Sequence, residues 1–123
     1  MQDTNGEGLK KVLDQPNIVN EIQGNYNKAL RHNSGKLDWT LLDFDCLIPM
    51  VEGMTYGATK YTRNNWKLQC DDPKQHLQSA MRHLIAIIQG EEIDEESGVR
   101  HSGLIQCNMM MYNYHSKDIT NEK

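Results

Sequence analysis

Apolar residues recur at three- and four-residue spacing in three stretches of the chain. In residues 43–60 the apolar stripe consists of Leu47, Ile48, Val51, Met54, Thr55 and Ala58. In residues 73–90 it consists of Leu77, Ala80, Met81, Leu84, Ile85 and Ile88. In residues 97–115 the inward face is His101, Leu104, Ile105, Asn108, Met111, Tyr112 and His115. This spacing predicts three amphipathic helices that bury these faces. Strand signals are weak throughout, so the sequence predicts an all-α fold.

The predicted helix ends follow from local chemistry. Asp72 and Pro73, with Gln75 three residues after the cap, are typical of a helix start, and Gly90 is a typical stop. Asp43 is a suitable cap for the helix over residues 43–60. Pro49 lies within that helix and predicts either a kink or a start nearer Ile48, because proline lacks the backbone donor.

The N-terminal 34 residues are expected to form a separate arm. Leu9, Val12 and Leu13 favour one helical turn, which Pro16 ends, and residues 17–30 again have a helical rhythm. We therefore expect an arm over residues 1–34, a helical domain over residues 35–116 and a polar tail over residues 117–123. The arm could simply pack against a neighbour, swap onto a partner subunit or cover a site.

Composition narrows the class of protein. A chain of 123 residues forms one domain, and a hydrophobic fraction of 37% favours a core completed by homo-oligomerisation. The net charge of -4 argues against binding to a nucleic-acid polymer. Three cysteines without a CxxC pair indicate neither a disulfide framework nor a zinc knuckle, and no apolar run is long enough to span a membrane. The expected location is the cytoplasm.

The densest charge in the chain lies between the second and third predicted helices. Its carboxylates are Glu91, Glu92, Asp94, Glu95 and Glu96. Glu91 and Asp94, at ExxD spacing, could share a Mg²⁺ ion, which prefers oxygen ligands and completes its shell with waters and phosphate oxygens. The alternative is a solvated cap, with residues 94–96 at the N-terminus of the following helix.

Histidines and an asparagine lie beside these acids. His101 and Asn108 fall on the inward face of the last helix and therefore need polar partners, which could be a ligand or simply backbone carbonyls. His83 lies off the apolar stripe of its helix and is expected to face a second layer or solvent.

Basic and aromatic side chains suited to a nucleotide occur along the same region. Lys36, Lys60, Arg63 and Arg82 could hold phosphates, and Trp39, Tyr56, Tyr61 and Trp66 could stack on a base. Individually each is also typical of an ordinary surface or packing residue. No nucleophile motif and no phosphate-binding glycine loop is present, so the residues favour attack of a metal-activated water on a phosphoanhydride.

Four segments in order resemble one known family. They are GKLDWTLLDFDCL, YGATKYTRNNW, AMRHLIAIIQGEEIDEESGVRH and CN, between about Gly35 and Tyr114. They are similar to the N-terminal domain family of phage dATP/dGTP diphosphohydrolases, which is related to the all-α MazG-type nucleotide pyrophosphohydrolases. The resemblance implies an oligomeric helical bundle, a phage origin in a host cytoplasm, and Mg²⁺-dependent release of pyrophosphate from a purine deoxynucleoside triphosphate.

The resemblance also implies roles for matching residues. Glu91 and Asp94 would hold Mg²⁺, and the catalytic candidates are Glu96, His101 and His83. The substrate-binding candidates are Lys36, Tyr56, Lys60, Asn65, Trp66, Arg82 and Asn108. The chain departs from the MazG pattern because the helix over residues 43–60 has Glu52 but no ExxE pair.

Three interpretations follow. The first is a nucleoside triphosphate pyrophosphohydrolase. The second is a protein that binds a purine nucleotide or a nucleotide-derived signal, cyclic or of ADP-ribose type, without cleaving it; the missing ExxE favours this one. The third is a structural or interaction protein, for which no nucleotide would raise the melting temperature.

Overall fold

The computed structural model describes residues 7–14, 29–30 and 35–121. Its helices are α1 (Glu7–Leu13), α3 (Ile48–Lys60), α4 (Lys74–Ile88) and α5 (His101–Asn121), with 3-10 turns η1 (Trp39–Leu41), η2 (Phe44–Leu47) and η3 (Asn65–Lys67). The described residues contain no strand, only an isolated bridge between Ile93 and Arg100. The all-α prediction is therefore confirmed. Residues 17–28 of the expected arm helix lie outside the described residues.

The chain divides into two units, Met1–Leu42 and Asp43–Lys123. The first contains α1, η1 and Lys36, and the second contains α3, α4 and α5. No described helix is long and apolar enough to cross a membrane. The boundary expected after residue 34 stays a prediction.

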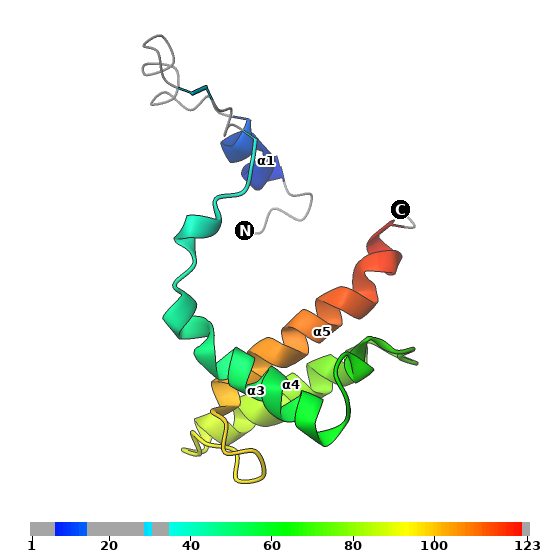
Figure 1. Cartoon of the computed structure of the whole chain (residues 1–123). Helices are drawn as coiled ribbons and strands as arrows, with labels where there is room; N and C mark the ends of the chain where they lie inside the picture. Colours follow the sequence, from blue (N-terminus) through cyan, green and yellow to red (C-terminus); the bar gives the residue numbers. More distant parts are fainter. Residues whose placement is uncertain (1–6, 15–28, 31–34, 122–123) are drawn as a thin grey trace. The chain divides into compact units, whose positions relative to one another are not determined.

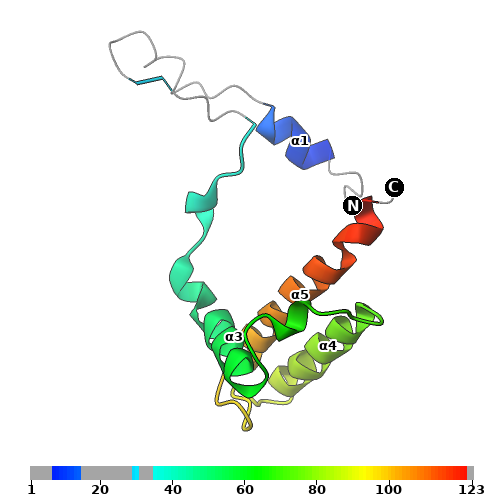
Figure 2. The same cartoon turned by 45° about the vertical axis from the view of Figure 1, so that its right-hand side comes forward.

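Helix α5 is the centre of the second unit, because both α3 and α4 pack against it (Figures 1 and 2). The α3–α5 contact is close since both helices present glycine: a Cβ on Gly103 would lie 2.4 Å from the backbone of Pro49, and a Cβ on Gly53 would lie 2.8 Å from Cys107 Sγ. Val99, Cys107 and Ala80 are the buried apolar residues of the described part.

The start of α3 follows the proline alternative. The Asp43 side chain accepts a hydrogen bond from the Asp45 backbone N–H and so caps η2, while α3 itself begins at Ile48 with Pro49 in its first turn. There proline interrupts no intrahelical hydrogen bond. The prediction of a start nearer Ile48 is confirmed.

The ends of α4 lie within one residue of the prediction: the helix begins at Lys74, with Pro73 and not Asp72 at the N-cap position. Asp72 Oδ1 accepts from the Lys74 backbone N–H at 3.0 Å, and Gly90, with φ +95°, follows the last turn. The predicted core stripe, however, is only partly right: Ala80 is buried and Leu77 is half-buried. Much of it is exposed: Met81 is 56% exposed, Leu84 44%, Ile85 45% and Ile88 74%.

A neighbouring stripe of α4 is buried or half-buried instead, namely His76, Ala80, His83 and Ile87. The physical reason is that α5 offers polar partners on that side, since His83 pairs with His101 and His76 stacks on His115. On α3 the predicted stripe is likewise partly wrong, because Ile48 and Val51 are more than half exposed.

The last helix was expected to start at residue 97, and this expectation is wrong. It starts at His101, because residues 91–100 close into a loop through the Ile93–Arg100 bridge and the left-handed Gly98, φ +73°. We call residues 91–100 the acidic loop. Its carboxylates at 94–96 therefore do not lie at a helix N-terminus. At its other end α5 continues past the expected stop at His115 to Asn121.

Candidate functional site

A cavity of about 1050 Å³ lies between α3, α4 and α5, and the segment that follows α3 forms part of its wall. We call it the main cavity. Four of the predicted substrate-binding residues line it: Asn65, Trp66, Arg82 and Asn108. Arg63 also lines it, and no aspartate or glutamate is among the described residues of its wall. The wall thus combines aromatic rings and side-chain amides with the guanidinium groups of Arg63 and Arg82.

Trp66 is fixed in this wall from two sides. Asn64 adopts a left-handed conformation, φ 64°, which turns the chain into η3. The Trp66 ring then packs edge-to-face on Tyr114, with centroids 5.1 Å apart. Its backbone carbonyl oxygen lies 2.6 Å from His115 Nε2. The half-buried indole is therefore positioned before any ligand arrives.

Arg82 and Asn108 face the cavity from α4 and α5. Arg82 Nη2 donates to Ser79 Oγ at 3.3 Å, and the side chain is otherwise exposed. Asn108 Nδ2 donates to the Leu104 carbonyl oxygen at 2.9 Å. A backbone carbonyl was one of the two kinds of partner expected for this side chain. The Asn108 side chain is also a hydrogen-bond partner of His76.

A chain of three side chains links α4, α5 and the acidic loop. His83 Nδ1 lies 2.8 Å from His101 Nδ1, and His101 Nε2 lies 3.2 Å from Glu91 Oε1. His101 is 4% exposed, whereas Glu91 is at the surface. Burial, followed by the neighbouring His101, lowers the pKa of His83 below its usual 6.5. Both expected inward polar groups of α5 are therefore partnered, and His83 faces inward, not toward solvent.

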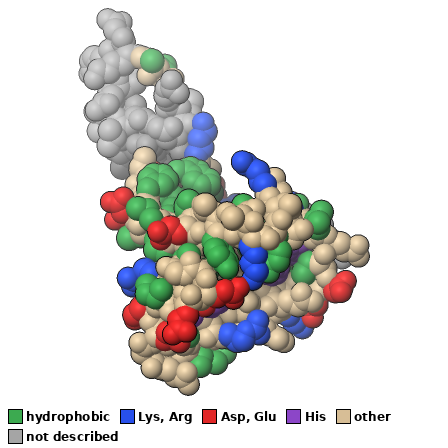
Figure 3. Space-filling model, turned by 60° about the horizontal axis from the view of Figure 1, so that its bottom comes forward, with side chains coloured by type: hydrophobic (Ala, Val, Ile, Leu, Met, Phe, Trp, Pro, Cys, Tyr) green, Lys and Arg blue, Asp and Glu red, His purple; other side chains and the backbone are tan. Residues whose placement is uncertain are grey.

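Asp94 holds the acidic loop together. Its Oδ2 accepts from the backbone N–H of Ser97 at 3.0 Å and from Ser97 Oγ at 2.7 Å. Burial raises the pKa of Asp94, but these two hydrogen bonds and the histidines nearby outweigh burial and leave it below 3.8. The carboxylate is thus ionised at neutral pH. Figure 3, viewed from the end of the unit that carries this loop, shows acidic side chains interspersed with basic and apolar ones.

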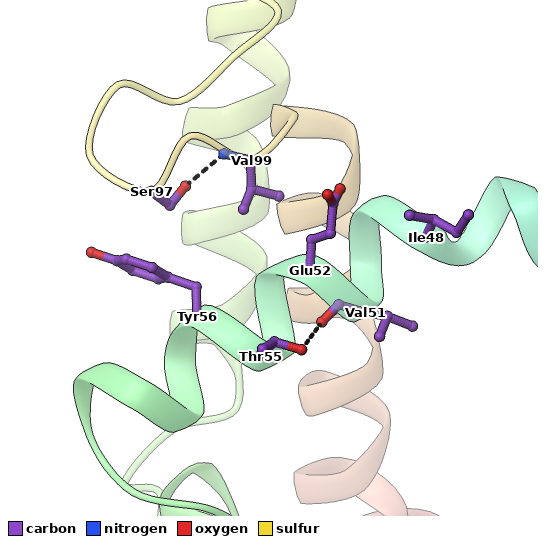
Figure 4. A pocket seen from close by; sticks show the side chains of 7 residues that line it. All are labelled: Ile48, Val51, Glu52, Thr55, Tyr56, Ser97 and Val99. Carbon is purple, nitrogen blue, oxygen red and sulfur yellow. Dashed lines mark hydrogen bonds between the residues drawn. The ribbon is translucent and has the colours of Figure 1, made fainter.

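Three predicted site residues meet on the outer side of the acidic loop. Lys60 Nζ lies 2.5 Å from Glu96 Oε1, and Tyr56 Oη donates to the same oxygen at 3.4 Å. The hydrogen bond from Lys60 is the main cause that lowers the pKa of Glu96. Here the Lys60 charge is balanced by Glu96. Figure 4 shows a pocket of about 430 Å³ beside this cluster. Helix α3 contributes Glu52 and Tyr56 to its lining, and the acidic loop contributes Ser97 and Val99.

The predicted site residues therefore fall into three groups within the second unit: the main cavity, the His83–His101–Glu91 chain with Asp94, and the Lys60–Glu96–Tyr56 surface cluster. Lys36 belongs to the first unit, so its role in holding phosphates stays a prediction.

The sequence interpretation missed one cluster. One ligand atom from each of Cys70, His76 and His115 lies within 4.8 Å of the other two, and all three residues are half-buried. The absence of a CxxC pair argued against a zinc knuckle, but Cys70 and His76 are separated by only five residues and His115 is supplied by α5. That short spacing is the signal that was available.

Comparison with known proteins identifies a family. Residues 26–122 match the family described as dATP/dGTP diphosphohydrolase, N-terminal. No curated protein and no solved structure matches the chain. The family match covers most of the chain, including all of α3, α4, α5 and the acidic loop, and agrees with the helical packing described above. The chain therefore belongs to the dATP/dGTP diphosphohydrolase N-terminal family, with its all-α, MazG-like fold.

Proposed function

We propose that this protein binds a purine (deoxy)nucleoside triphosphate in the main cavity and hydrolyses it, with Mg²⁺, to the monophosphate and pyrophosphate. The observation that carries the proposal is the composition of the cavity wall: Trp66, Asn65 and Asn108 beside Arg63 and Arg82, without a described carboxylate. A volume of about 1050 Å³ is close to the upper end of the range of pockets that enclose small ligands.

The base would stack on Trp66, because an indole already held by Tyr114 loses little freedom on binding. Stacking on an aromatic side chain contributes about 1–3 kcal/mol per base and does not depend on which base is present. Preference for a purine would instead come from the amides of Asn65 and Asn108, whose donors and acceptors can pair with ring edges.

The phosphates would be held by Arg82 and Arg63. A guanidinium group stays charged at all physiological pH values and forms paired hydrogen bonds with phosphate oxygens. Both arginines are exposed at the cavity and form no ion pair with a described carboxylate. Their charge is therefore available to a polyanion.

The histidine chain would supply a proton acceptor. If neutral His101 donates its Nε2–H to Glu91, its Nδ1 accepts from His83 Nδ1–H, and His83 Nε2 then carries a lone pair. Because burial keeps the pKa of His83 low, this imidazole is neutral at pH 7 and can take a proton from an attacking water. His101 would act as the positioning residue.

Magnesium would be held by Glu91 and Asp94. The donors fit this cation, since they are oxygen ligands, Asp94 is ionised, and Mg²⁺ needs only one or two carboxylates besides water and phosphate. When bound, the ion would polarise a phosphoryl oxygen and favour the attacking water.

A second candidate is binding without hydrolysis, of a triphosphate or of a nucleotide-derived signal. It is favoured by one observation: the carboxylates proposed for Mg²⁺ lie on the acidic loop and not in the wall of the main cavity. In that case the cavity would sequester its ligand intact.

The test is product analysis by anion-exchange chromatography after incubation with dATP or dGTP and Mg²⁺. Asp94→Asn keeps an oxygen that can accept from Ser97 but removes a charge, so we expect turnover to fall at least about 10- to 100-fold while calorimetry still detects nucleotide binding. Glu95→Gln, on the same loop, is the matched control and should retain full turnover.

Each outcome has a distinct meaning. Monophosphate plus pyrophosphate from the wild type, lost in Asp94→Asn, supports hydrolysis with the proposed metal ligands. Stoichiometric recovery of intact nucleotide from the denatured complex supports the second candidate. If no nucleotide raises the melting temperature, both are wrong and the structural interpretation holds.

A further inference from the structure

Cys70, His76 and His115 come together from three segments at one end of the α4–α5 contact. Cys70 lies in the loop between η3 and α4, His76 lies in the first turn of α4, and His115 lies in the C-terminal half of α5. Cys70 Sγ is 4.0 Å from His76 Nε2, and the two imidazole rings stack with centroids 5.5 Å apart at 9°. All three side chains are half-buried.

The spacing of these donors is near that of a transition-metal site. With a Zn–S bond of about 2.3 Å and Zn–N bonds of about 2.0–2.1 Å, tetrahedral ligands lie roughly 3.3–3.6 Å apart. The three ligand atoms lie within 4.8 Å of one another, so a bound ion would draw them closer together. One thiolate and two imidazoles are soft and borderline donors, which favour zinc and exclude magnesium or calcium as the preferred ion.

The surroundings of His115 point the same way. Its Nε2 donates to the Trp66 carbonyl oxygen at 2.6 Å, which fixes the ring and leaves the lone pair on Nδ1. Metal-binding histidines typically have their second nitrogen held by a carbonyl or carboxylate in this manner.

We infer that Cys70, His76 and His115 form a binding site for a zinc-class cation, with three protein ligands and one open position. The ion would join the loop that follows η3 to both α4 and α5. His76 also lines the main cavity, so the site borders it. It is separate from the acidic loop that is proposed to hold magnesium, and it does not depend on nucleotide hydrolysis.

The experiment is a Co²⁺ titration of the full-length protein, purified with a reductant, stripped with a chelator and desalted. Co²⁺ reports thiolate ligation through a sulfur-to-metal charge-transfer band in the near ultraviolet. We expect one equivalent of Co²⁺ to develop the band, one equivalent of Zn²⁺ to abolish it, and excess Mg²⁺ to leave it unchanged. Zn²⁺ should also raise the melting temperature.

Two cysteine variants make the test specific. Cys70→Ser should lose the band and the rise in melting temperature, whereas Cys46→Ser, which removes an exposed thiol of η2, should keep both. His115→Asn should weaken Co²⁺ affinity at least tenfold while its nucleotide-free circular dichroism stays helical. A band that persists in Cys70→Ser, or less than one equivalent bound by the wild type, would overturn the inference.

Discussion

The Cys107 thiol donates a hydrogen bond to the Met50 carbonyl oxygen at 3.2 Å and is 4% exposed. Burial raises its pKa from 9.0 to about 11. Since the thiolate is the nucleophile, we expect iodoacetamide at pH 8 to modify Cys46, which is exposed, and to leave Cys107 unmodified until the protein unfolds. Peptide mass spectrometry after short labelling measures both sites, and equal labelling would contradict the burial.

The raised pKa of Cys107 also makes the stability of the folded state depend on pH. Because the folded pKa of Cys107 is raised, the folded state benefits from keeping the thiol protonated. This contribution is complete below pH 9.0 and is lost as the pH rises toward 11.

For individual side chains, the sequence alone predicted some orientations correctly. The inward positions of His101 and Asn108 follow from the apolar neighbours that share their face. The position of His83 could not be found in the same way, because helical periodicity selects the most apolar stripe, here Leu84 and Ile85. What decides the orientation is the pairing with His101 on α5, which is a long-range contact that local patterns do not encode.

Between elements, the contact of α3 with α5 depends on the absence of a side chain at Gly103. An added Cβ would lie 2.4 Å from the Pro49 carbonyl carbon and oxygen, and a backbone cannot rotate away. We expect Gly103→Ala to lower the free energy of unfolding by about 1–3 kcal/mol or more through overpacking. Chemical denaturation with circular dichroism gives the value.

Gly57, inside α3, is the matched control. A Cβ added there would have no atom within 4 Å, so Gly57→Ala should be neutral or stabilise the protein by about 0.5–1 kcal/mol. Equal effects of the two substitutions would show that the helices do not approach as described.

The helix ends illustrate where local chemistry suffices. Asp72 with Pro73, and Gly90 after the last turn, predicted the limits of α4 to within one residue, because caps act on neighbouring backbone groups. The start of α5 was misplaced by four residues, since Asp94, Ser97 and Gly98 build a loop whose closure requires pairing of Ile93 with Arg100.

For the molecule as a whole, the exposed apolar side of α4 departs from what a self-sufficient core would bury. Met81, Leu84, Ile85 and Ile88 are each at least 44% exposed. The expectation of a homo-oligomer explains this face if a second copy covers it, since burying one such side chain contributes about 1.5–3 kcal/mol.

We therefore expect Ile88→Glu to weaken self-association by about tenfold or more, measured by analytical ultracentrifugation across a concentration series. Leu68→Glu, at an exposed apolar residue in the loop before α4, is the control and should behave as the wild type. A wild type that stays monomeric at the highest concentration would contradict the expectation.

The close approach of Pro49 and Gly103 also has a meaning for protein engineering. Helices α3 and α5 each form part of the wall of the main cavity, and their separation is set by backbone atoms in contact. The spacing of these two helices cannot be changed by exchanging cavity side chains, whereas Tyr61, Thr62 and Arg63 line the cavity from an exposed segment. A library for altered ligand preference should therefore diversify that segment and keep Pro49 and Gly103 constant, so that selection acts on recognition and not on folding.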